Sequence, residues 1–109
     1  MLTILNGRPH FWQWDTNQYL IVDNPDVNQI HFASPITTSS YVCEVFASGS
    51  DRVVCVPNAI LQQGKKFFAY SVIANNNDIT AVAQQTFLVY PRVKPEELVT
   101  RRNNYADHS

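Results

Sequence analysis

The sequence predicts an all-β fold, an immunoglobulin-like antiparallel β-sandwich of about seven to eight strands with one short helix near residues 57–63. Aromatic and β-branched residues gather in short runs, and turn-forming residues separate these runs at the spacing of a sandwich. Only residues 57–64 break this rhythm; the proline at their start and the glycine at their end fit one or two helical turns.

The clearest expected element is a β-hairpin over residues 67–90. Asn75–Asp78 suit its loop because Asn and Asp tolerate left-handed backbone angles. This loop places Ala74 opposite Ile79 and predicts one face that is more apolar than the other. We expect that face to be buried. Its larger residues are Phe68, Tyr70 and Val72.

The other expected strands come earlier in the chain. A turn at Asn6-Gly7 closes the first of them, and a tight turn at Thr16-Asn17 joins the second to the third. In that second hairpin Trp14 faces Tyr19, and Trp12 lies on the same strand face as Trp14. These strands are expected at residues 1–5, 11–15, 17–23, 29–33, 41–47 and 52–56.

The two cysteines lie on a further expected hairpin whose loop is Ser48–Asp51. This loop places Val45 opposite Val54 and points the Cys43 and Cys55 side chains to opposite faces. A loop one residue different would place the two thiols opposite each other and allow a disulfide. The apolar match favours the first register, so we expect free thiols.

No pattern for catalysis, metal binding or cofactor binding is present. The histidines, His10, His31 and His108, lack ligand spacing, and three glycines form no phosphate-binding loop. There is no nucleophile motif, and Glu44 alone within a strand does not make an acid–base pair. We therefore expect no enzyme, no metal and no cofactor.

The charge pattern argues against nucleic acid and membrane as partners. Net charge is −1, and the aromatic segments 11–22 and 67–90 contain no lysine or arginine. No apolar run approaches the roughly 20 residues that cross a bilayer. The first residues lack the pattern of a signal peptide, so we expect synthesis in a cytoplasm.

Partner-protein contacts remain, and two regions could supply them. Trp12 and Trp14 could be core aromatics or an exposed patch for a partner. We expect a sandwich domain at residues 1–91 and a tail at residues 92–109, which could be a solvated end or an arm on a neighbouring subunit. The candidate partner-binding residues are Trp12, Trp14, Tyr19, Arg92, Lys94, Leu98, Val99 and Tyr105.

Four segments, residues 11–22, 28–32, 53–62 and 89–99, occur in a familiar order. Their most specific motifs are W-D-x-N-Q at 14–18, V-P-N-x-x-L-Q at 56–62 and P-R-x-K-P at 91–95. On these motifs, residues 8–99 resemble a small structural domain family of bacteriophage and prophage virions, similar to the amino-terminal domain of phage baseplate upper proteins.

The resemblance implies a β-sandwich that anchors or decorates a virion and has no catalytic residues. We expect the chain to bind other virion proteins, as a homo-oligomer or in multiple copies on the particle. Longer members continue into fibre-like domains, whereas ten residues follow Val99 here, which favours an adaptor or decoration role in the tail, baseplate or head. Two alternatives stay open. One is a carbohydrate-binding sandwich with Trp12, Trp14 or Tyr19 as its stacking platform, and the other is a small inhibitor of a host enzyme.

Overall fold

The computed structural model describes residues 1–36 and 40–94, which form an all-β domain with one short helix. The all-β prediction is confirmed. The described residues contain ten strands, more than the expected seven or eight. The elements are β1 (Leu2–Ile4), β2 (Phe11–Trp12), β3 (Tyr19–Val22), β4 (Gln29–Ala33), β5 (Ser40–Glu44), β6 (Phe46–Ser48), β7 (Asp51–Cys55), α1 (Asn58–Gln62), β8 (Phe67–Ala74), β9 (Ile79–Phe87) and β10 (Val89–Tyr90).

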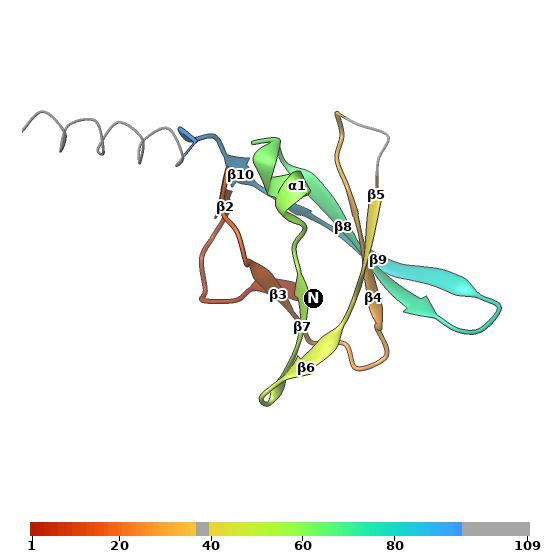
Figure 1. Ribbon diagram of the computed structural model, residues 1–109. Helices are drawn as coiled ribbons and strands as arrows, with labels where there is room; N and C mark the ends of the chain where they lie inside the picture. The colour runs from red at the N-terminus through yellow and green to blue at the C-terminus, as the bar shows by residue number, and fades with distance from the viewer. Residues whose placement is uncertain (37–39, 95–109) are drawn as a thin grey trace, which may run out of the picture.

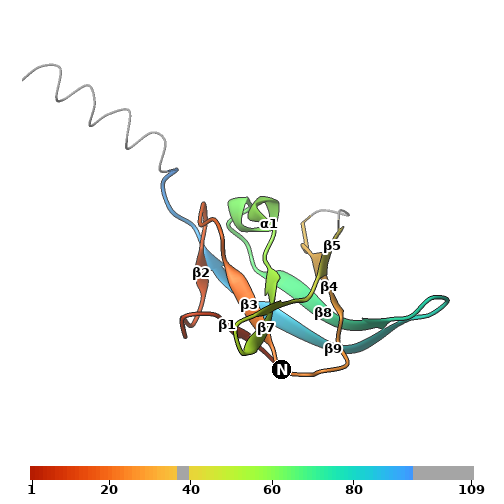
Figure 2. The ribbon, with the colours of Figure 1, turned by 60° about the horizontal axis from the view of Figure 1, so that its bottom comes forward.

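Two antiparallel four-stranded sheets make up most of the fold, and both are open (Figures 1 and 2). Their strand orders are β1-β3-β7-β6 and β5-β4-β8-β9. A third, two-stranded sheet pairs β2 with β10 in parallel. The central core draws buried residues from both large sheets, such as Leu20 and Val54 from one and Ile30 and Phe32 from the other. This arrangement is consistent with a sandwich.

Three buried phenylalanines hold the core together at the end where β2, α1 and β8 meet. The Phe67 ring lies 5.8 Å from the Phe11 ring and 5.9 Å from the Phe32 ring, measured between centroids. The helix adds Ile60 and Leu61, as its sequence pattern predicts. Each such side chain contributes roughly 1.5–3 kcal/mol when it is fully buried.

The β8–β9 hairpin has the expected loop. The Asn75 amide donates to the Asp78 carbonyl at 2.8 Å, and Ala74 lies opposite Ile79. The register changes farther from the loop, because a β-bulge leaves Val82 without an opposite residue on β8. Bulges of this kind bend a strand and increase its twist.

The buried face of this hairpin was wrongly predicted. Phe67 and Ala69 point into the core, whereas Phe68 and Tyr70 lie on the outer face and are half-buried. Val72 is buried, as expected, but it does not belong to the central core cluster. Strand β4, which pairs with β8 on the side away from β9, decides this orientation. It places the buried Phe32 opposite Ala69, so both residues face the core. Both faces of β8 are apolar, so the hairpin sequence alone does not identify the inner one.

The expected hairpin of residues 11–23 was also wrong. The chain turns after Trp12, where the Asp15 amide donates to the Trp12 carbonyl at 3.1 Å, and Trp14 and Asn17 have positive φ angles. Strand β3 consequently pairs with β1 and β7 instead of β2. Trp12 and Trp14 therefore do not share a strand face.

The expected cysteine hairpin is divided between the two sheets. Strand β6 pairs with β7 in the predicted register, with Phe46 opposite Val53. Strand β5 instead pairs with β4, which places Cys43 opposite Ile30, so the chain crosses between the sheets at Val45. Cys43 and Cys55 are free thiols.

Candidate interaction surfaces

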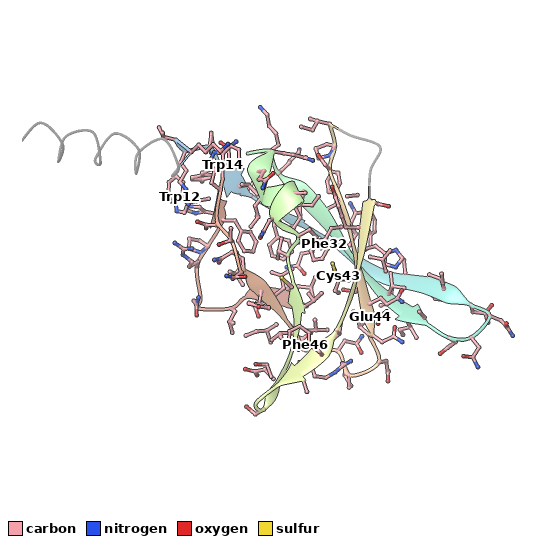
Figure 3. All side chains as sticks on the ribbon, in the orientation of Figure 1. Trp12, Trp14, Phe32, Cys43, Glu44 and Phe46 are labelled. Atoms are coloured by element: carbon pink, nitrogen blue, oxygen red, sulfur yellow. The ribbon has the colours of Figure 1, made fainter. Side chains whose placement is uncertain are left out.

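The first candidate surface lies where residues 89–94 leave the domain, and we call it the exit cluster. The parallel pairing of β2 with β10 builds it, because Phe11 and Val89 are buried and their neighbours point outward. Figure 3 shows the labelled Trp12 and Trp14 at this end of the molecule. The exit cluster comprises Arg8, His10, Trp12, Trp14, Asp15, Tyr90, Arg92 and Lys94.

Three rings of the exit cluster pack on one another. The His10 ring stacks on the Tyr90 ring with centroids 4.0 Å apart, and the Trp12 ring meets Tyr90 edge-on at 5.5 Å and 89°. Trp12 is 36% exposed. The His10 Nε2 atom is buried and has no hydrogen-bond partner among the described residues. The rings thus cover much of each other's surface and are not coplanar.

Asp15 is the polar centre of the exit cluster. Its side chain is only 11% exposed, and its carboxylate accepts hydrogen bonds from the Trp12 amide at 3.2 Å, from Arg8 at 3.3 Å and from Arg92 at 3.1 Å. The Arg92 Nε atom also donates to the Gln13 carbonyl at 2.6 Å. Charge-assisted bonds of this kind are stronger than neutral ones and fix the course of the chain after β10.

Two further contacts hold the same turn. The Lys94 ammonium lies 5.2 Å from the centroid of the Trp14 ring, a cation–π contact. The Gln13 side chain donates to the Gln62 carbonyl at 2.8 Å and packs against Gly64, where an added Cβ would lie 2.9 Å from the Gln13 Cδ atom. Gly64 has a φ of +63°, so glycine is favoured there for both reasons.

The structure brings together four of the predicted partner-binding residues, namely Trp12, Trp14, Arg92 and Lys94. Tyr19 lies elsewhere, and Leu98, Val99 and Tyr105 lie outside the described residues.

The second candidate surface is a shallow hollow on the outer face of the β1-β3-β7-β6 sheet. The Tyr19 and Phe46 rings meet there edge-on, 6.2 Å apart between centroids. Phe46, labelled on β6 in Figure 3, is 47% exposed. The hollow is lined by Leu5, Tyr19, Phe46, Ser48 and Val53.

The third candidate surface is strand β9, the edge of the β5-β4-β8-β9 sheet. All six residues from 79 to 84 are exposed, and the apolar ones include Ile79 at 69% and Val82 at 46%. The hairpin that carries β9 projects away from the exit cluster, at the right of Figures 1 and 2.

One side chain connects β9 to the other sheet. The Leu2 amide donates to the Gln85 Oε1 atom at 3.0 Å, and the Gln85 Nε2 atom donates to the Leu2 carbonyl at 2.7 Å. The Gln85 amide thereby pairs with β1 as a neighbouring strand would. It thus satisfies the backbone amide and carbonyl of Leu2 at the outer edge of β1, which would otherwise need water or a partner.

The described residues contain no group of three or more His, Cys, Asp or Glu side chains that could hold a metal ion.

Burial, and secondly the electrostatic effect of Cys55, raises the pKa of the Cys43 thiol. Cys43 is half-buried and packs against the central core between the sheets (Figure 3). Among the residues described, no helix has the length and apolar character needed to span a membrane.

Sequence reasoning did not identify Asp15 or Gln85 as important positions. Asp15 was assigned to a strand end, and its role depends on Arg92, which lies 77 residues later. The Gln85 contact spans 83 residues. Asp15 belongs to the W-D-x-N-Q motif at residues 14–18, but that motif gave it no structural role.

Comparisons of the chain with protein-family models, with curated proteins and with solved structures found no match.

Proposed function

We propose that this chain is a non-enzymatic structural protein of a bacteriophage virion, an adaptor or decoration component of the tail, baseplate or head that acts through protein–protein contacts. The motifs at residues 14–18, 56–62 and 91–95 support this role by their resemblance to virion domains. Other virion proteins are the proposed partners, and the chain is proposed to be present in several copies on the particle.

The observation that carries the proposal is the exposed strand β9. A long strand with a neighbour on one side only offers backbone groups to another chain, and natural domains usually blunt such an edge with charges, proline or a covering segment. Residues 79–84 carry no charge or proline, and they are exposed. A protein whose task is to join other proteins has a use for such an edge.

We also propose that the fold follows the immunoglobulin-like plan. In that plan one sheet has the strand order A-B-E-D and the other contains C, F and G, with an added C′ strand in variable-type domains. The orders β1-β3-β7-β6 and β5-β4-β8-β9 correspond to A-B-E-D and C′-C-F-G. Strands β2 and β10 are then additions, and β9 takes the place of the G strand. A different strand order in an experimental structure would contradict this assignment.

The carbohydrate-binding alternative is less well supported. A stacking platform for sugars needs exposed rings in one plane, but the Trp12 ring stands at 89° to Tyr90 and at 72° to His10. Tyr19 lies apart, on the outer face of the other large sheet. Glycan-array binding that is lost in a Trp12→Ala variant would revive this alternative.

The direct experiment is to purify particles of the phage, or of the induced prophage, that encodes the chain and to quantify its peptides by mass spectrometry. We expect the chain in gradient-purified particles at a fixed ratio to the major capsid protein. A non-structural protein from the same genome serves as the control for contamination. Particles that lack the chain, or that contain it only at the level of this control, would contradict the proposal.

A further inference from the structure

We infer that two copies of this chain associate through β9, with the two strands pairing antiparallel about a two-fold axis. This would join two β5-β4-β8-β9 sheets into one continuous sheet. The inference concerns an interaction surface and a partner, a second copy of the chain. It does not depend on the proposed virion role, because its test uses the purified protein alone.

The four edges of the two large sheets differ in how far they are protected. Strand β1 has three residues, and its Leu2 backbone is engaged by Gln85. Strand β6 also has three residues and ends at a turn. Strand β5 has five residues, and its Glu44 accepts a hydrogen bond from the Gln29 side chain at 3.1 Å. Short edges and edge charges are the devices by which sheets avoid pairing.

Strand β9 has few of these protections. It is nine residues long and contains no charged residue, no proline and no glycine. Its one interruption is the bulge at Val82, which leaves that residue without an opposite partner on β8. A bulge bends the edge, so we expect an association that is weak at low concentration and increases with concentration.

A second copy suits this edge for two reasons. An isologous two-fold interface pairs the same strand with itself, and an uncharged strand meets no like charge in that arrangement. With the axis near Val82, the Asp78 carboxylates of the two copies lie roughly 26 Å apart, given about 3.3 Å per residue over eight positions. Pairing also covers Ile79 and Val82, both exposed in the single chain.

The shape of the molecule permits this contact. The β8–β9 hairpin extends past the other strands of its sheet, opposite the side where residues 91–94 leave (Figures 1 and 2). A second hairpin can therefore approach β9 without meeting the exit cluster of either copy.

The test measures molar mass by light scattering and sedimentation over a wide range of protein concentration. We expect the mass of the unmodified chain to rise from 12.4 kDa towards twice that value as concentration increases. Val82→Lys places two ammonium groups opposite each other and should raise the dissociation constant roughly tenfold or more. Val42→Lys is the matched control. It makes the same substitution at a residue that is 56% exposed on the opposite edge strand, β5, and should leave association unchanged.

A charge exchange separates pairing from folding effects. Val82→Glu should also weaken association on its own, whereas an equimolar mixture of the Lys and Glu variants should associate at least as well as the unmodified chain. Circular dichroism checks that each variant is folded. The inference is overturned if the unmodified chain stays monomeric throughout, if Val42→Lys has the larger effect, or if mixing the two charged variants restores nothing.

Discussion

The two ends of this domain use aromatic and polar groups in opposite ways. At the exit cluster, Trp12, Tyr90 and His10 pack on each other, and Asp15 joins Arg8 and Arg92. At the β8–β9 end, Ile79 and Val82 are exposed, and β9 has a neighbouring strand on one side only among the described residues. The charged groups of the exit cluster have partners within the chain, while the outer edge of β9 has backbone groups available for contacts outside it.

This difference shows that residue types common at interfaces and exposed groups without partners can lie in different parts of one domain. Tryptophan and arginine are enriched at protein interfaces, so they draw attention first. Here they hold residues 91–94 in place, and the unpaired backbone edge lies in β9, a strand without charged residues. Under the proposed pairing of β9, exposed apolar and backbone groups without internal partners indicate the contact surface better than residue type does.

The largest expected effect comes from removing the core support of the exit end. Phe67→Ala deletes a ring that contacts Phe11, Phe32 and Phe87, and it should lower the free energy of unfolding by about 3–5 kcal/mol. Urea denaturation measures this change. The matched variant Phe68→Ala removes the same side chain from the outer face of β8 and should cost much less. Equal losses would contradict the assignment of the inner face.

A smaller loss is expected when the polar centre of the exit cluster is removed. Asp15→Ala leaves the Trp12 amide and the Arg92 Nη2 atom without this acceptor, which should cost about 1–3 kcal/mol in urea denaturation. Arg8→Ala is the control, because it removes only one partly exposed ion pair, which is typically worth about 0–1 kcal/mol. If Arg8→Ala were the more damaging variant, Asp15 would not be the centre of this cluster.

The smallest expected effect concerns the connection between β9 and β1. Gln85→Ala removes two hydrogen bonds to the Leu2 backbone and should cost about 1–2 kcal/mol. The neighbouring Gln84→Ala alters an exposed side chain and should stay within about 0.5 kcal/mol of the unmodified protein. Thermal unfolding of both variants measures the difference. Two indistinguishable unfolding curves would show that Gln85 does not stabilise this edge.

Local patterns in the sequence predicted the fold class, the short helix, the loop at Asn75–Asp78 and the β6–β7 register. Each of these depends on residues close together in the chain. The inner face of β8 depends on β4, which pairs with it from about forty residues away. The turn after Trp12 depends on Asp15 and on the parallel pairing of β2 with β10. No local pattern encodes that pairing.

The candidate site was predicted less well for the same reason. Trp12, Trp14, Arg92 and Lys94 were named from the sequence, and the structure places them together. The contacts of Arg92 with Gln13 and Asp15 and of Lys94 with Trp14 join segments about eighty residues apart. The absence of charge in β9 was visible in the sequence. Its meaning required the strand order, which places β9 at an edge.

The most direct test of the difference between the two ends is hydrogen–deuterium exchange of the unmodified chain at low and high protein concentration. We predict that amides of residues 79–84 exchange more slowly at high concentration, because β9 pairs with a second copy, while those of residues 11–14 are unchanged. Exchange of residues 79–84 that is identical at both concentrations would contradict the assignment of β9 as the contact edge.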